Sequence, residues 1–168
     1  MRFALLFIAC FGILNTTAQL GPNIPGDLIL QSDEDYAGHL ALARKSLAWL
    51  INTPLDEHID KRNEVNAFVM LWLSGSPTIT LEIDSKAMPF IHDDETLIFP
   101  FIHGVALYQL GHPECKDKSK LHAEGLRVVN KANKQSKCVK STKTLRAISK
   151  AEKRKKLAKL AEEWLSAE

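Results

Sequence analysis

Cysteine and histidine residues in the second half of the chain are the first that could do covalent chemistry. Cys115 has His112 before it and His122 after it, and a histidine beside a thiol can act as its general base. Cys115, however, lies in a loop rich in proline and lysine rather than at the start of a helix that faces a cleft. This context favours an ordinary surface cysteine.

Residue types that bind metals occur in a row at His92-Asp93-Asp94-Glu95. Adjacent side chains point in different directions and rarely all reach one ion, and no His-x-x-x-His or Glu-x-x-His pair on a helix completes a ligand set. The run is better explained as a loop and helix cap rich in acidic groups. We therefore predict no metal site.

A third candidate is His103, which lies inside the most apolar stretch of the chain. A buried imidazole must find a hydrogen-bond partner, and a structural core histidine is favoured over a ligand or general base. The sequence contains no Gly-rich phosphate loop, dinucleotide fingerprint, Gly-x-Ser-x-Gly or Cys-x-x-Cys motif. We predict no catalytic residue and no cofactor; the alternative is a small periplasmic enzyme that uses His103 or the Cys115 neighbourhood.

The strongest candidate for binding is a basic run near the C-terminus, beside the apolar stripe of Leu157, Leu160, Trp164 and Leu165. This pattern is typical of a helix that lies on an anionic surface. It also fits a solvated lysine face, or docking onto the chain's own acidic part. No aromatic residue interleaves with the lysines to stack on bases, so nucleic acid is not an expected partner. The basic residues are Lys150, Lys153, Arg154, Lys155, Lys156 and Lys159.

Charges are distributed unevenly along the chain. Residues 19–114 contain 5 basic and 14 acidic residues, whereas residues 115–168 contain 16 basic and 6 acidic residues. Residues 1–18, an apolar run after Met1-Arg2 that ends in small residues at Ala18, are typical of a signal peptide. We expect a secreted or periplasmic protein without a transmembrane segment after cleavage, whose partner is a protein or an anionic envelope surface.

Two cysteines, Cys115 and Cys138, follow the predicted cleavage site, and an oxidising compartment favours a disulfide. If the residues from Asp117 to Ser136 form one helix, it spans about 30 Å, whereas a disulfide needs Cα atoms within about 7 Å. We therefore predict that these cysteines do not pair with each other. The sequence leaves open whether either pairs with another chain.

The element that must organise these residues is the stretch 96–111, which carries no charge if His103 is neutral. It is too short to cross a bilayer, which takes about 20 helical residues. We predict a buried central helix that is capped within residues 93–96, has a kinked start near Pro100 and ends at Gly111.

Apolar periodicity predicts the other helices. Ser32 caps an amphipathic helix that runs to residue 52, and a second helix covers residues 57–73. Further helices cover residues 117–135 and 142–148. Ser149 and Glu152 then form a capping box that opens a last helix, with a bend near Ser149.

These elements predict an all-α protein, an irregular bundle of five or six helices, with tetratricopeptide-like helix pairs as the alternative. Residues 78–84 alternate like a strand. They either pair briefly with residues 28–30 or, as we favour, cross the helices in extended form. Residues 19–31 form an extended leader, and residues 32–168 form a single helical domain, since about 150 residues suffice for one core.

Three segments carry a resemblance to known proteins. They are the stretch from Phe68 to Ile83, the later Tyr108-Gln-Leu, and the closing Lys-Leu-Ala-Glu-Glu-Trp-Leu. They resemble a family of small exported bacterial proteins of helical character with no assigned activity. The resemblance implies an envelope or secreted setting and brings no catalytic residue. We expect an exported, non-enzymatic helical binding or structural module.

Overall fold

The computed structural model describes residues 21–82 and 87–167, so the predicted signal peptide, residues 1–18, lies outside the described residues. All regular structure in the described residues is helical and none of it is strand, which confirms the predicted all-α fold. The α-helices are α1 (Asp33–Gly38), α2 (Leu40–Asn52), α3 (Ile59–Gly75), α4 (Ile98–Gly111), α5 (Lys118–Gln135), α6 (Lys143–Lys153) and α7 (Leu157–Leu165). Two 3-10 turns, η2 (Pro89–His92) and η3 (Glu95–Leu97), precede α4.

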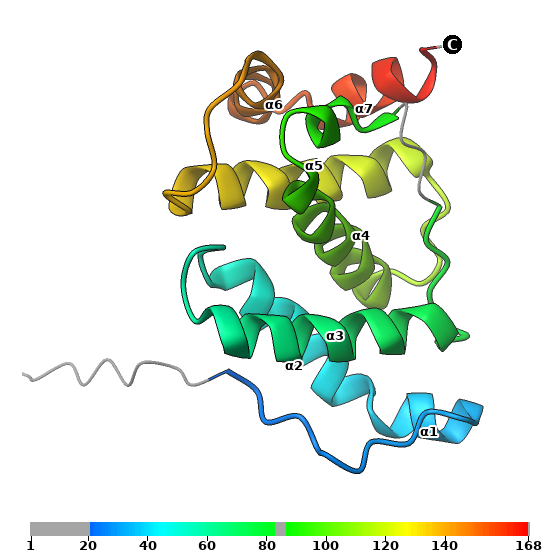
Figure 1. Cartoon of the computed structure of the whole chain (residues 1–168). Helices are drawn as coiled ribbons and strands as arrows, with labels where there is room; N and C mark the ends of the chain where they lie inside the picture. The colour runs from blue at the N-terminus through cyan, green and yellow to red at the C-terminus, as the bar shows by residue number, and fades with distance from the viewer. Residues whose placement is uncertain (1–20, 83–86, 168) are drawn as a thin grey trace, which may run out of the picture.

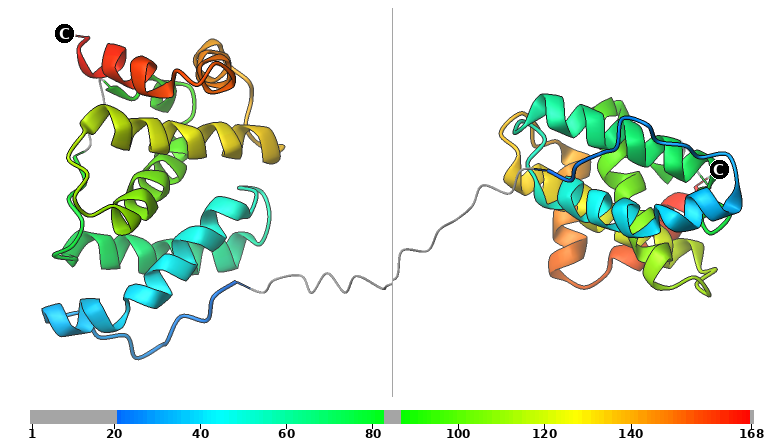
Figure 2. Two further views of the ribbon diagram at one scale, coloured as in Figure 1. Left: turned by 180° about the vertical axis from the view of Figure 1, so that it is seen from behind. Right: turned by 90° about the horizontal axis from the view of Figure 1, so that it is seen from below.

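The helices form an irregular bundle around α4 (Figure 1). Helices α2 and α3 lie on one side of α4, with α1 at the edge of this layer, and α5 crosses α4 on the other side. Helices α6 and α7 pack beyond α5, an order that is also visible from behind in Figure 2. Helices α1 to α3 and the basic helices α6 and α7 therefore lie on opposite sides of α4, whereas the acidic run at residues 92–95 lies beside the start of α6.

The first predicted helix is interrupted at His39, which divides it into α1 and α2 and brings the described α-helices to seven. Ser32 caps α1 as predicted. Its Oγ accepts a hydrogen bond from Asp35 N (3.3 Å), and Asp35 Oδ2 accepts one from Ser32 N (2.9 Å). Backbone hydrogen bonds from Gln31 and Ser32 hold the pKa of the Asp35 carboxyl below its usual value.

Two extended segments pack against the α2–α3 layer. In the leader, Ile24, Leu28 and Leu30 are partly buried against the side chains of this layer. Residues 78–82, the described part of the predicted extended segment, form no strand, and Ile79 is buried in the same cluster. This agrees with the extended crossing rather than with strand pairing.

Helix α4 lies between two hydrophobic clusters, which explains why its sequence is apolar on every side. Phe101 and Val105 pack with side chains of α5, α6 and α7. Ile102, Ala106 and Leu110 instead pack with side chains of α2 and α3. A helix with neighbours all round needs no polar stripe. The predicted buried central helix is confirmed.

The chain enters α4 through the 3-10 turn η3. Asp94 caps this turn by accepting a hydrogen bond from Thr96 N (3.0 Å). Pro100 is the third residue of α4, where the backbone N–H has no helical acceptor, so its absence costs little. The sequence predicts a kinked start near Pro100, and the structure has an irregular 3-10 turn, η3, immediately before the helix instead. Helix α4 then continues to Gly111 as expected.

Helices α4 and α5 cross at two glycines. A Cβ atom on Gly104 would lie 2.7 Å from the carbonyl oxygen of Glu124 and 3.0 Å from the Cα of Gly125. A Cβ atom on Gly125 would lie 2.5 Å from the ring of Phe101. Glycine is thus required at the crossing because backbone approaches backbone there.

The predicted capping box at Ser149 is wrong, because Ser149 lies inside α6 and the helix continues to Lys153. Thr142 caps α6 instead, accepting a hydrogen bond from Leu145 N (3.2 Å). Glu152 reaches across to α5, where it pairs with Lys134 (2.8 Å) rather than with the backbone at Ser149. The expected bend therefore comes after Lys153, between α6 and α7.

Candidate functional site

The six predicted surface cations form what we call the basic corner: Lys150, Lys153, Arg154, Lys155, Lys156 and Lys159. All six are exposed. They do not lie on one helix, as the sequence pattern predicts, but on the end of α6, the connecting turn and the first half of α7. The structure thus gathers them where two helices meet, at the outer edge of the molecule (Figure 1).

The turn between α6 and α7 has the hydrogen bonds of a Schellman motif. Lys156 N donates to Ala151 O (2.8 Å) and Lys155 N donates to Glu152 O (2.9 Å). Lys155 occupies the left-handed position of this motif, with φ 56°, where glycine is usual. A side chain in this conformation costs about 1–2 kcal/mol. The chain therefore carries a strained lysine at the tip of its most basic surface.

None of the six residues forms an ion pair with an acidic group in residues 21–82 or 87–167. Lys150 and Lys153 are favourably placed in the last turn of α6, where the helix dipole attracts cations. No such local role applies to Lys155 and Lys156, which follow the helix. Intramolecular docking onto the acidic part of the chain, one of the alternatives considered above, has no support in these contacts.

The apolar stripe of α7 packs within the protein. Leu157 and Ala161 are buried in the cluster that includes α5, and Leu160 and Trp164 pack against it. The prediction of an amphipathic helix is right, but its apolar face covers α5 and is not available for insertion into a lipid surface. The charges of the basic corner, by contrast, are exposed to solvent.

His103 is a structural core residue in its contacts. Its side chain is 1% exposed, and Nε2 lies 2.9 Å from Asn66 Oδ1. Burial, with a smaller contribution from the positive charge of Arg62, lowers the pKa of His103 from 6.5 to about 3. The imidazole is therefore neutral at physiological pH, and it donates its Nε2 proton to the amide oxygen.

The histidines around Cys115 are held by other rings. His112 stacks on Tyr108 with ring centroids 4.1 Å apart, and His122 packs edge-on against Phe101 at 4.9 Å. Cys115 and Cys138 do not pair with each other, as predicted; both are free, and the 18-residue α5 lies between them. The thiol of Cys115 forms no hydrogen bond with the described part of the chain, so the structure offers no thiol paired with a base.

The acidic run at residues 92–95 serves the local structure. Asp94 Oδ1 accepts a hydrogen bond from Thr96 Oγ1 (2.6 Å), while Asp93 Oδ2 accepts one from Thr142 Oγ1 (2.7 Å) at the start of α6. The bond from Thr142 is the main cause that lowers the pKa of Asp93. Across the described ranges, no three His, Cys, Asp or Glu side chains are grouped to hold a metal ion.

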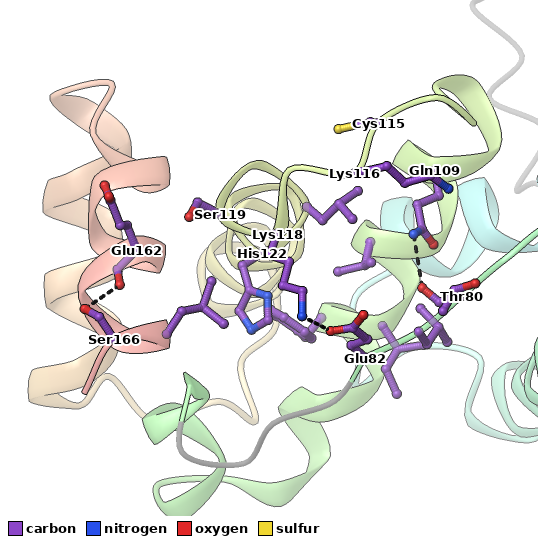
Figure 3. A pocket seen from close by; sticks show the side chains of 16 residues that line it. Thr80, Glu82, Gln109, Cys115, Lys116, Lys118, Ser119, His122, Glu162 and Ser166 are labelled. Carbon is purple, nitrogen blue, oxygen red and sulfur yellow. Dashed lines mark hydrogen bonds and ion pairs between the residues drawn. The ribbon is translucent and has the colours of Figure 1, made fainter. Parts of the chain in front are cut away.

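A groove that the sequence did not predict opens between α4, the start of α5, the end of α7 and the extended residues 80–82 (Figure 3). Its volume is about 720 Å³. The polar side chains at its rim include Lys116, Lys118 and Glu162. Its apolar lining residues are Leu81, Phe101, Ile102, Val105, Leu121 and Leu165.

Two polar contacts shape the rim of this groove. Lys118 on α5 forms an ion pair with Glu82 (Figure 3). On α4, Gln109 Nε2 donates a hydrogen bond to Thr80 O (3.1 Å). Both contacts tie the extended segment to the helices. Residues from four separate segments thus meet at one opening, which no local pattern in the sequence could show.

Comparisons of the chain with protein-family models, curated proteins and solved structures gave no match. Among the described residues, every helix is too short or too polar to cross a membrane. The basic corner and the groove are the two surface features whose geometry and charge bear on function.

Proposed function

We propose that the chain is an exported, non-enzymatic helical binding module of the bacterial envelope that contacts an anionic partner through the basic corner. The observation that carries this proposal is the run of four consecutive exposed cations, Lys153 to Lys156, none of which is paired in the described structure. One of them, Lys155, is held in a strained backbone conformation. Strained residues of this kind tend to be kept where their side chain has a use.

The expected contact is electrostatic. Each lysine near an anionic lipid surface contributes about 1 kcal/mol, and this attraction decreases within a Debye length of about 8 Å at physiological salt. Because the apolar face of α7 is buried, no insertion of apolar side chains from that face adds to the binding. Binding should therefore weaken steeply as the salt concentration rises.

The alternative function, a small periplasmic enzyme, has less support. His103 would need an open nitrogen next to a substrate, but its ring is buried and its Nε2 faces Asn66. Cys115 lies near histidines whose rings pack on Tyr108 and Phe101. Neither arrangement brings a nucleophile and a base together in the described residues.

Sedimentation with vesicles of phosphatidylcholine and phosphatidylglycerol tests the proposal. We expect the wild-type chain to bind at low salt and dissociate as salt rises. The triple variant Lys153→Glu, Lys155→Glu, Lys156→Glu removes about 3 kcal/mol of attraction, which corresponds to a loss of binding of about 100-fold. Binding that survives this change would refute the role of the basic corner.

A matched control separates position from net charge. Lys137, Lys140 and Lys143 are exposed before or at the start of α6, away from the basic corner. Changing these three to glutamate alters the net charge by the same amount, and we expect a much smaller loss of binding. Equal losses in both triple variants would show that overall charge, rather than the corner, governs the association.

A further inference from the structure

We propose that the groove between α4, α5 and α7 binds a medium-chain carboxylic acid, a ligand with an apolar body and one anionic end (Figure 3). The volume of about 720 Å³ lies within the range of small-molecule sites. None of its lining residues belongs to the basic corner. This inference therefore goes beyond the proposed function, and each of the two can fail without the other.

The body of the ligand follows from the lining of the groove. Ile102 and Val105 of α4 form part of its buried wall, and Leu121 and Leu165, which are only partly buried, add apolar surface from α5 and α7. Covering this surface removes it from water, which favours an aliphatic ligand. A ligand without an apolar body would leave these side chains exposed to water.

The charge of the ligand follows from the rim at the start of α5. Lys116 is exposed there and has no ion-pair partner within the described residues. Lys118 pairs with Glu82, but both side chains are more than half exposed, and such pairs contribute little. A ligand carboxylate can thus contact Lys116 and compete for Lys118.

A further donor lies at the start of α5, where the Asp117 carboxylate already caps the helix by accepting a hydrogen bond from Lys120 N (3.1 Å). Ser119, in the first turn of α5, lines the groove beside Lys118 (Figure 3). Its hydroxyl can donate a hydrogen bond to a carboxylate that is already held by the lysines.

The other rim fixes the direction of the ligand. Glu162 and Ser166 border the groove from α7, across from Gln109 and Thr80 (Figure 3). The carboxylate of Glu162 would repel an anion there. The ligand's carboxylate therefore lies toward Lys116 and its aliphatic chain extends along Leu121 toward Leu165.

The chain carries its own reporter for this site. Cys115 lines the groove, whereas Cys138 is an exposed free cysteine in the loop after α5 and does not line it. The rate at which iodoacetamide alkylates each cysteine can be followed by mass spectrometry of the peptides. We expect decanoate to slow the alkylation of Cys115 severalfold while the rate at Cys138 stays unchanged.

Ligands of other chemistry test the two parts of the proposal separately. Decylamine and decanol keep the chain but lack the anion, and acetate keeps the anion but lacks the chain; all three should protect Cys115 much less than decanoate. Equal protection by decylamine would overturn the anionic end. No protection by decanoate, or equal slowing at both cysteines, would overturn the site itself.

Two variants locate the binding within the groove. Lys116→Gln removes the free cation, and we expect it to raise the decanoate concentration needed for protection about tenfold, as loss of a charged hydrogen bond does. Leu165→Trp fills the groove, so decanoate should no longer protect Cys115 in this variant. The rate at which Cys138 is alkylated should equal that of wild type. Lys116→Gln that protects like wild type would refute the carboxylate contact. Vesicle binding of both variants should equal that of wild type.

Discussion

Gly104→Ala is the sharpest test of how α4 and α5 pack. The new methyl group would lie 2.7 Å from Glu124 O, 2.8 Å from Val128 Cγ2 and 3.0 Å from Gly125 Cα. The Val128 side chain can move, but two of these three atoms belong to the backbone of α5. Relief of the overlap therefore requires the two helices to separate, and this interface is the most extensive in the bundle.

The magnitude follows from two opposing effects. Overpacking of a filled core costs about 1–3 kcal/mol, whereas alanine is better than glycine inside a helix by about 1 kcal/mol. Because two of the close atoms are backbone, the overpacking cost should lie in the upper part of this range, about 2–3 kcal/mol, and we expect a net loss of about 1–2 kcal/mol of unfolding free energy. For a chain of this size, this loss lowers the melting temperature by about 2–8 °C.

Urea denaturation followed by circular dichroism measures this loss, and the same helix provides the control. Gly111 ends α4, and a Cβ atom placed on it meets nothing within 4 Å. Gly111→Ala should therefore be neutral or stabilise the protein by up to about 1 kcal/mol. If Gly104→Ala proved as stable as Gly111→Ala, the close contact between α4 and α5 would be wrong.

Two further predictions concern single side chains. Lys155→Gly should raise the free energy of unfolding by about 1 kcal/mol, because glycine relieves the strain of the left-handed backbone. Lys156→Gly removes the same charge at φ −120° and should not raise it. Equal effects of the two variants in urea denaturation would show that the turn is unstrained. Folding lowers the pKa of His103 from 6.5 to about 3, so its contribution to stability is complete above pH 6.5 and is lost as the pH falls toward 3. As the pH falls across this window, the unfolding free energy of wild type should decrease by up to about 1.4 kcal/mol per pH unit more than that of His103→Gln. Urea denaturation at a series of pH values measures this difference, and parallel curves for the two proteins would contradict the burial of a neutral imidazole.

Much of the helical framework could be predicted from local patterns. Ser32 capped a helix as expected, and the uncharged stretch 96–111 proved to be the helix between the two clusters. These signals are local, because a cap or an apolar period depends on residues within a few turns of each other. The close approach of Gly104 to α5 was not predictable, since it depends on a glycine more than twenty residues away.

The capping box shows why a local signal can mislead. Ser149 and Glu152 have the Ser-x-x-Glu spacing of a capping box, but two residues with this spacing can also lie inside a helix. The partners of Glu152 decide its role, and they are Asn130, Lys134 and Arg127 of α5. These contacts hold Glu152 on the face of α6 that packs against α5, and α6 continues past Ser149 to Lys153.

The amphipathic pattern of α7 shows the same ambiguity in the candidate site. An apolar stripe beside a run of lysines fits a helix that lies on a membrane and equally fits a helix that covers its own core. The choice depends on whether α5 has an apolar face that needs covering. It does, because Leu126 and Val129 of α5 are fully buried in the cluster that also holds Leu157 and Ala161 of α7. Because the apolar stripe of α7 packs against α5, the basic corner attracts a partner through its charges. Binding that weakens as the salt concentration rises therefore distinguishes the basic corner from a helix that inserts apolar side chains into a membrane.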